Sequence, residues 1–340
     1  MNKPNTFFAY LKLVRIGNLL MIAFSLSLFY YLILVPVHQD KLLPTLLPFS
    51  NLNFVLFVLS IVLVAAAGNV INDYLDFEAD KEYKPNRPLT TGAISLDTAV
   101  YLHGVFAIAG IAIGFYLGWL SHNLRIGYIY IMAVLLLYLY SAFLKKIVLL
   151  GNILIAALTG FIFVLLLMFE SNYLQSLRNF IENGNIGDLH LDSNEVVATI
   201  ENVLLIIVTQ VRFYAGFAFI ISLAREIVKD LEDREGDAAH KVHTLPVQLG
   251  ERAGKITVVL VLVGLLGGLS YVMAGFAQIR AFKELSYLLF TVAIPVVILI
   301  GWILFSGDAK PYRKISTALK IIMLMGILSI PAFYLFEKMS

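Results

Sequence analysis

Acidic residues gather in two short segments, each directly after a long apolar run. The first acidic segment, residues 72–80, follows the apolar run 54–71, and the second, residues 225–237, follows the run 203–224. Carboxylates are costly to desolvate at the edge of a membrane, so a repeated cluster of them predicts a functional site. The two segments are therefore the candidate functional site of this chain.

The spacing within each segment would place its polar side chains on one face of a helix. The residues concerned are Asn72, Asp76 and Asp80 in the first segment and Glu226, Asp230, Asp233 and Asp237 in the second. At about 100° per residue, the first set spans an arc of about 80° and the second an arc of about 60°. Both faces offer oxygen ligands, and the chain has no cysteine, so they favour magnesium over zinc or copper.

Magnesium prefers a site that carboxylates share with the phosphates of a substrate. Two facing clusters would hold two or more such ions with a diphosphate between them, and nearby cations would complete the neutralisation of its charge. These cations are Lys81, Lys84, Arg87, Lys145, Lys146, Arg225, Lys229 and Lys241. A hydrophobic helix bundle beneath the site would accept a long apolar tail, which together with the diphosphate describes a polyprenyl diphosphate. Metal-assisted departure of pyrophosphate would leave an allylic carbocation that prenylates a nucleophile held nearby.

The composition indicates where the two acidic segments lie. Apolar residues make up 60% of the chain and charged residues 14%, with a mean hydropathy of +0.85, which excludes an ordinary soluble domain. Runs of about 20 apolar residues predict helices that cross a membrane. We predict nine such spans, at residues 16–36, 53–75, 97–119, 125–144, 148–169, 203–226, 255–276, 285–306 and 319–336. They predict one all-α polytopic membrane domain over residues 1–340, with an outer loop insertion at about 170–202.

Lysine and arginine are distributed unevenly between the two sides of this predicted bundle. With the N-terminus inside, 18 of them lie on the inner side and 6 on the outer side, and Arg212 lies within the sixth span. The excess predicts a multi-pass protein of the cell inner or plasma membrane, with the N-terminus and both acidic segments cytoplasmic. The first apolar run is too long for the hydrophobic region of a signal peptide, so we expect it to be a retained span.

Two motifs within the acidic segments resemble the paired aspartate-rich motifs of the UbiA-type intramembrane prenyltransferase superfamily. They are Asn72-Asp73-x-x-Asp76-x-x-x-Asp80 and Asp230-x-x-Asp233-x-x-x-Asp237, and shorter matches are Arg15-x-x-Asn18, Tyr140-Ser141, Lys145-Lys146 and Gly151-Asn152. The run from Arg225 to Asp237 most resembles one archaeal-type branch, geranylgeranylglycerol-phosphate geranylgeranyltransferase or digeranylgeranylglyceryl phosphate synthase. That branch attaches a second C20 chain, as an ether, to a glycerol phosphate lipid.

This resemblance implies a bundle of nine helices around a lipid-accessible cavity and a magnesium-dependent prenyl transfer. The implied magnesium ligands are Asn72, Asp76, Asp80, Asp230, Asp233 and Asp237, and the implied catalytic residues among them are Asp76, Asp80, Asp233 and Asp237. The implied substrate-binding residues are Asn18, Asp73, Lys84, Arg87, Tyr140, Lys145, Arg225, Glu226, Lys229 and Lys241. The donor would be an isoprenoid diphosphate of about C20 and the acceptor geranylgeranylglyceryl phosphate. Membrane lipids would surround the protein, and we expect no nucleic acid and no obligate protein partner.

Two alternatives stay open. Within the same superfamily, the acceptor would be aromatic, either a quinone precursor such as 1,4-dihydroxy-2-naphthoate or 4-hydroxybenzoate, or a haem or chlorin. An aromatic acceptor needs an apolar stacking pocket, whereas a phosphorylated glycerol needs a further anion site, which the basic loops favour. Outside the superfamily, a cation-coupled transporter would use the carboxylates as ion ligands. Transporters place such groups near the bilayer midplane on broken helices, whereas both acidic segments stand at the predicted cytoplasmic edge.

Overall fold

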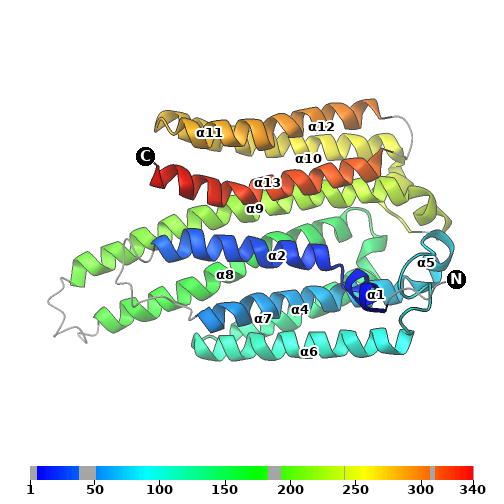
Figure 1. Ribbon diagram of the computed structural model, residues 1–340, viewed down its shortest axis with the longest axis horizontal. Helices are drawn as coiled ribbons and strands as arrows, with labels where there is room; N and C mark the ends of the chain where they lie inside the picture. The colour runs from blue at the N-terminus through cyan, green and yellow to red at the C-terminus, as the bar shows by residue number, and fades with distance from the viewer. Residues whose placement is uncertain (1–5, 38–50, 183–192, 241, 307–310, 340) are drawn as a thin grey trace. The chain divides into compact units, whose positions relative to one another are not determined.

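The structure, a computed structural model, describes residues 6–37, 51–182, 193–240, 242–306 and 311–339. Helices and short connecting turns make up these residues, which contain no strand. Nine helical spans in this part of the chain are long and apolar enough to cross a membrane, as predicted (Figure 1). The chain divides into two compact units, of which the first comprises Met1–Ser141 and Ile162–Phe213 and the second Ala142–Phe161 and Tyr214–Ser340.

The first unit contains the N-terminal helices. They are α1 (Thr6–Leu13), α2 (Ile16–Phe29), which continues through the π-helical turn η1 (Tyr30–Leu34), α4 (Asn51–Leu75), α5 (Phe77–Tyr83), α6 (Leu96–Leu120) and α7 (Arg125–Ala142). Small residues let α4 and α6 pack closely, since a Cβ on Gly110 would lie only 3.1 Å from the carbonyl oxygen of Ser60. The packing of α6 therefore holds α4, which carries most of the first acidic segment.

The second unit contains a short 3-10 helix from the middle of the chain and the C-terminal helices. They are η2 (Leu144–Lys146), α10 (Leu245–Gln278), α11 (Phe282–Leu288), η3 (Leu289–Ala293), α12 (Ile294–Phe305) and α13 (Tyr312–Lys338). α10 bends near its start at Gly250, whose φ of 85° is a conformation that side-chain-bearing residues rarely adopt. Two long helices, α8 (Leu150–Glu182) and α9 (Ser193–Ala239), contribute to both units.

The stretch 170–202, predicted to be an outer loop, is helical as far as Glu182 and again from Ser193. Apolar runs predict where a helix crosses a membrane, but a helix continues beyond such a run as long as the backbone can sustain it. Neither glycine nor proline occurs in residues 170–182 or 193–202, so nothing in these stretches breaks the helix. The helices α8 and α9 are consequently longer than the predicted spans 148–169 and 203–226.

Candidate active site

The first acidic segment lies where α4 gives way to α5. Asp76 separates the two helices with φ −88° and ψ 0°, yet the helical hydrogen bonding continues on both sides of it. The amide of Asp76 donates to the carbonyl of Asn72 at 3.0 Å, and the amide of Asp80 donates to the carbonyl of Asp76 at 2.8 Å. The side-chain amide of Asn72 also donates to Oδ2 of Asp76 at 3.2 Å. The predicted spacing of these three residues therefore survives the break between the helices.

Asp80 is buried in this segment, with 6% of its surface exposed. Its Oδ2 lies 3.0 Å from Nη1 of Arg87, but that approach is not a hydrogen bond, and no other donor in the described part of the chain reaches this oxygen. Burial raises the pKa of Asp80 to about 6, Arg87 opposes this shift, and the nearby charge of Asp76 adds to it. A buried carboxylate oxygen without a donor is destabilising, so a bound cation would stabilise this arrangement.

Asp73, in the first acidic segment, forms an ion pair with Arg87, which follows that segment. Nη1 of Arg87 lies 2.5 Å from Oδ1 of Asp73, and Nη2 of Arg15 lies 2.9 Å from the same oxygen. Arg87 therefore contacts two carboxylates, those of Asp73 and Asp80. Its segment is compact, because Oγ1 of Thr90 lies 2.9 Å from the carbonyl oxygen of Arg87.

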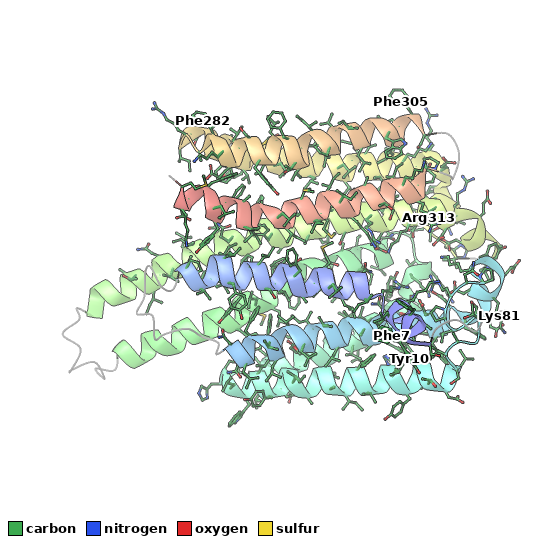
Figure 2. All side chains as sticks on the ribbon, in the orientation of Figure 1. Phe7, Tyr10, Lys81, Phe282, Phe305 and Arg313 are labelled. Carbon is green, nitrogen blue, oxygen red and sulfur yellow. The ribbon has the colours of Figure 1, made fainter. Side chains whose placement is uncertain are left out.

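On its exposed side, α5 carries a different kind of ion pair. Nζ of Lys81 lies 3.0 Å from Oε1 of Glu78, and these side chains are 51% and 82% exposed. Figure 2 labels Lys81 on α5. Exposed pairs of this kind contribute little to stability. Glu78 thus belongs to the acidic segment by sequence but points to the surface, and it provides a matched control for the buried acids.

The second acidic segment lies within the continuous helix α9. The side-chain amide of Asn152, in the first turn of α8, donates to Oδ2 of Asp230 at 2.8 Å. Oε1 of Glu226 accepts from Nη1 of Arg225 at 3.1 Å and from Nζ of Lys229 at 2.5 Å. Glu226 is therefore already neutralised by two cations, while Asp230 is held by a neutral amide.

A network of charges ties the start of α10 to the end of α9 beside this segment. The carboxylate of Glu251 contacts Nη1 of Arg234 at 3.3 Å, Nζ of Lys255 at 3.1 Å and the hydroxyl of Tyr312 at 2.5 Å. Lys255 also donates to the backbone carbonyl of Ser306. Because these residues come from α9, α10, α13 and the end of α12, the network stabilises the helix ends around the second acidic segment.

Four of the other residues predicted to bind substrate lie at helix ends. Asn18 is half-buried in the first turn of α2, Lys84 follows α5, Tyr140 stands near the end of α7, and Lys145 belongs to η2. Lys241 lies outside the described residues. Among the residues that the structure describes, no three acidic or histidine side chains form a group that could hold a metal ion. Few carboxylates per ion are typical of magnesium, which is usually held by one or two of them together with water and substrate phosphates.

Two contact residues were absent from the predicted ligand and substrate sets. Arg15 contacts Asp73, and Asn152 contacts Asp230. Both had a signal in the sequence, because they stand in the short matches Arg15-x-x-Asn18 and Gly151-Asn152. Glu251 had no comparable signal, since a single acid at the start of a predicted span is uninformative by itself.

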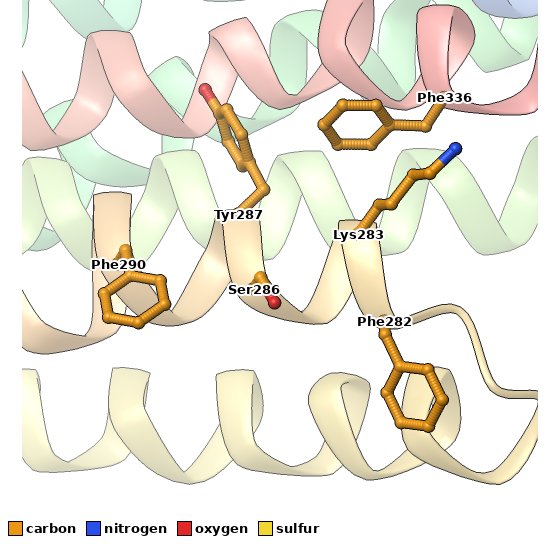
Figure 3. A pocket seen from close by; sticks show the side chains of 6 residues that line it. All are labelled: Phe282, Lys283, Ser286, Tyr287, Phe290 and Phe336. Atoms are coloured by element: carbon orange, nitrogen blue, oxygen red, sulfur yellow. The ribbon is translucent and has the colours of Figure 1, made fainter. Parts of the chain in front are cut away.

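The second unit also has a shallow hollow far from its acidic segment. It has a volume of about 560 Å³. Figure 3 shows the side chains that line it. The residues lining it are Phe282, Lys283, Ser286, Tyr287, Phe290 and Phe336. Figure 2 shows Phe282 and Phe305 at opposite ends of the continuous helical stretch formed by α11, η3 and α12. Among the described residues that line the hollow, none is acidic.

Known proteins resemble the chain over most of its length. Residues 42–328 match the model of the UbiA prenyltransferase family. A digeranylgeranylglyceryl phosphate synthase of Methanobrevibacter smithii is 29% identical over 322 residues, which are 94% of this chain and 95% of the relative. A solved structure of digeranylgeranylglyceryl phosphate synthase in membranes has a TM-score of 0.57 at 23% identity and covers 96% of this chain and 97% of that chain. A UbiA homologue from Archaeoglobus fulgidus bound to GPP and Mg2+ has a TM-score of 0.52 at 17% identity, covering 95% and 99%.

Proposed function

The chain belongs to the UbiA prenyltransferase family, and we propose that it transfers a geranylgeranyl group from its diphosphate to geranylgeranylglyceryl phosphate, forming an ether. It is an integral, multi-pass membrane enzyme that carries out prenyl transfer within the membrane. The observation that carries the proposed acceptor is the match to a digeranylgeranylglyceryl phosphate synthase, which spans 94% of this chain and 95% of the relative.

The residue types of each acidic segment suit magnesium, because they offer oxygen ligands. Among the described residues, none donates a hydrogen bond to the buried Oδ2 of Asp80, and the side chains proposed as ligands all offer oxygen atoms. We propose as ligands Asn72, Asp76 and Asp80 in the first segment and Asp230, Asp233 and Asp237 in the second. When bound, Mg2+ would neutralise the donor's diphosphate and make pyrophosphate a better leaving group. A fold relative bound to GPP and Mg2+ supports this assignment.

Cations beside the two acidic segments would complete the binding of the donor. In the first, Arg87 lies against Asp73 and Asp80, where it would meet a diphosphate held by the first acidic segment. In the second, Arg225 and Lys229 flank Glu226. Fixed positive charges of this kind stabilise the negative charge that develops on pyrophosphate as it leaves. The other proposed substrate-binding residues are Asn18, Asp73, Lys84, Tyr140, Lys145, Glu226 and Lys241.

The proposed reaction exchanges one carbon–oxygen bond for another. The bond between C1 of the geranylgeranyl donor and its diphosphate oxygen breaks, and pyrophosphate leaves with the electron pair. The hydroxyl oxygen of the acceptor then bonds to C1 and gives up its proton. Either a motif carboxylate or the released pyrophosphate takes that proton, so no separate base is required.

We also propose that the N-terminus and both acidic segments face the cytoplasm. The support is the excess of lysine and arginine on that side, 18 against 6 on the other. In this orientation the enzyme would draw the water-facing diphosphate from the cytoplasmic side, while the prenyl tails stay among the apolar spans.

The proposed acceptor is tested by offering two acceptors in parallel to the purified protein in lipid. Labelled geranylgeranyl diphosphate and Mg2+ are supplied with either geranylgeranylglyceryl phosphate or 1,4-dihydroxy-2-naphthoate. We expect product from the glyceryl phosphate and none from the naphthoate. Product from the naphthoate alone would contradict the proposed acceptor and place the enzyme among those that prenylate aromatic compounds.

A second test concerns the amide that holds Asp230. We expect Asn152→Ala to lower kcat/KM about 10- to 100-fold, because a ligand that loses its orienting hydrogen bond binds metal poorly. Raising the Mg2+ concentration should restore part of this loss. The control is Thr159→Ala on the same helix, which removes only a local hydrogen bond to the carbonyl of Ile155. An unchanged kcat/KM in Asn152→Ala would remove Asp230 from the proposed ligands.

A further inference from the structure

We infer that Asp73 is a positioning residue that holds Arg15 and Arg87 together at the first acidic segment, and that donor binding depends on Arg15 through this contact. The inference rests on the proposed function, because it concerns how the same site holds its diphosphate donor. It adds to that site a residue that precedes the first membrane span. It also gives Asp73 a role different from that of the metal-binding acids around it.

The burial of the three side chains supports this role. Asp73 is 5% exposed, whereas the side chains of Arg15 and Arg87 are 32% and 24% exposed. Oδ1 of Asp73 contacts both guanidinium groups, at 2.9 Å from Arg15 and 2.5 Å from Arg87. A buried carboxylate is stable only when it is paired, so Asp73 requires the arginines. Since the arginines and not the acid reach the surface, they are the groups that can meet a ligand.

The backbone at Arg15 has an unusual, left-handed conformation. Arg15 has φ 55° and ψ 54°, the left-handed conformation that residues with side chains avoid, and it separates α1 from α2. The chain is held on both sides of this bend. Nζ of Lys12 donates to the carbonyl of Asn86 at 2.7 Å, and the side-chain amide of Asn69 donates to the carbonyl of Val14 at 2.9 Å.

The apolar packing of α1 fixes the same arrangement. Its buried residues Ala9 and Leu13 share one hydrophobic cluster with Val70 of α4 and with Leu89, two residues after Arg87. Figure 2 shows Phe7 and Tyr10 on the same short helix, and these two side chains are exposed. A strained backbone persists only where its surroundings hold it, and here the surroundings are α4 and the segment that carries Arg87. The bend therefore places the side chain of Arg15 beside Asp73.

The contact chain links Arg15 to the proposed metal site. Arg87 contacts Asp73 and also lies 3.0 Å from Oδ2 of Asp80. If Asp73 is lost, both arginines lose their common partner and Arg87 keeps only its contact with Asp80. Asp73 should therefore affect the diphosphate, which the arginines would bind, much more than the metal ion, which the neighbouring acids would bind.

The test separates donor binding from metal binding in the full-length protein in lipid. The variants are Asp73→Asn, Arg15→Asn and their double mutant, with Asp80→Asn as the metal-site reference and Glu78→Gln as the surface control. Asparagine is chosen at position 15 because it tolerates the left-handed backbone, so the bend is kept while the guanidinium is removed. Equilibrium binding of labelled geranylgeranyl diphosphate and binding of Mn2+, followed by electron paramagnetic resonance, are the two readouts.

We expect Asp73→Asn and Arg15→Asn each to weaken donor binding about tenfold or more while Mn2+ binding is unchanged. The double mutant should be little weaker than Asp73→Asn alone, because both changes break one contact. Arg15→Lys, which returns a positive charge to position 15, should restore part of the affinity for the donor.

Three results would overturn the inference. One is loss of Mn2+ binding in Asp73→Asn to the same degree as in Asp80→Asn, which would make Asp73 a ligand. The second is unchanged donor binding in Arg15→Asn, which keeps this test decisive even where Asp73→Asn does not fold. The third is a double mutant whose loss is the product of the two single losses. Absence of transfer by the unaltered protein would instead count against the proposed function, because both readouts here measure binding.

Discussion

We expect Asp76→Asn to lower kcat/KM for prenyl transfer by at least about 1,000-fold while the protein still folds and inserts into the membrane. A metal ion contributes several kcal/mol of charge stabilisation to such a transition state, and about 4 kcal/mol corresponds to this factor. Asparagine keeps the size of the side chain and one oxygen but removes its negative charge. Steady-state kinetics with labelled geranylgeranyl diphosphate and saturating acceptor measure the effect.

The matched control is Glu78→Gln, two residues away in the same acidic segment. Glu78 is 82% exposed and pairs only with the surface residue Lys81, so its neutralisation should leave the rate unchanged. Asp233→Asn, in the second acidic segment, should match the loss of Asp76→Asn, because both segments are proposed to serve one diphosphate. A near-normal rate in either aspartate variant, with an unchanged metal requirement, would refute the two-segment magnesium site.

Removal of divalent cations should have an effect of similar size. We expect EDTA to reduce prenyl transfer to background and Mg2+ to restore it fully, since the proposed ligands are oxygens that favour this ion. The measurement is the initial rate of ether formation in EDTA, followed by titration with Mg2+. A rate that persists in EDTA would show that the acidic segments act without a metal and would exclude the proposed mechanism.

The same titration should depend on pH in a defined direction. Burial raises the pKa of Asp80 from 3.8 to about 6, so its protonated form prevails below that pH. A proton on Asp80 competes with the metal, and the Mg2+ concentration for half-maximal rate should rise as the pH falls through about 6. The surface control Glu78→Gln should keep this pH dependence.

The membrane fold and the family could be predicted from the sequence because both depend on local patterns. Each span is an apolar run of the length that a bilayer requires, and all backbone hydrogen bonds of a helix are satisfied within it. The nine predicted spans agree with the nine that the described residues contain. The paired motifs are equally local, since each occupies fewer than about three turns of helix.

The ends of the helices were predicted less well. The extension of α8 to Glu182 and the start of α9 at Ser193 follow from the absence of helix-breaking residues, a weak signal beside hydropathy. The break at Asp76 was also missed, because the segment from Asn72 to Asp80 contains no glycine or proline.

The sequence alone determined the spacing of the acids in each acidic segment, because that spacing follows from local helical hydrogen bonds, which in the first segment continue on both sides of Asp76. The tertiary structure decided which partners those side chains have. Asp73 meets Arg15 across 58 residues, and Asp230 meets Asn152 across 78. Such contacts depend on how distant helices pack, and the free energy of pairing a buried carboxylate arises only after the helices have come together. The acids of the site could therefore be identified from their spacing, whereas the residues that hold them became visible only in the folded chain.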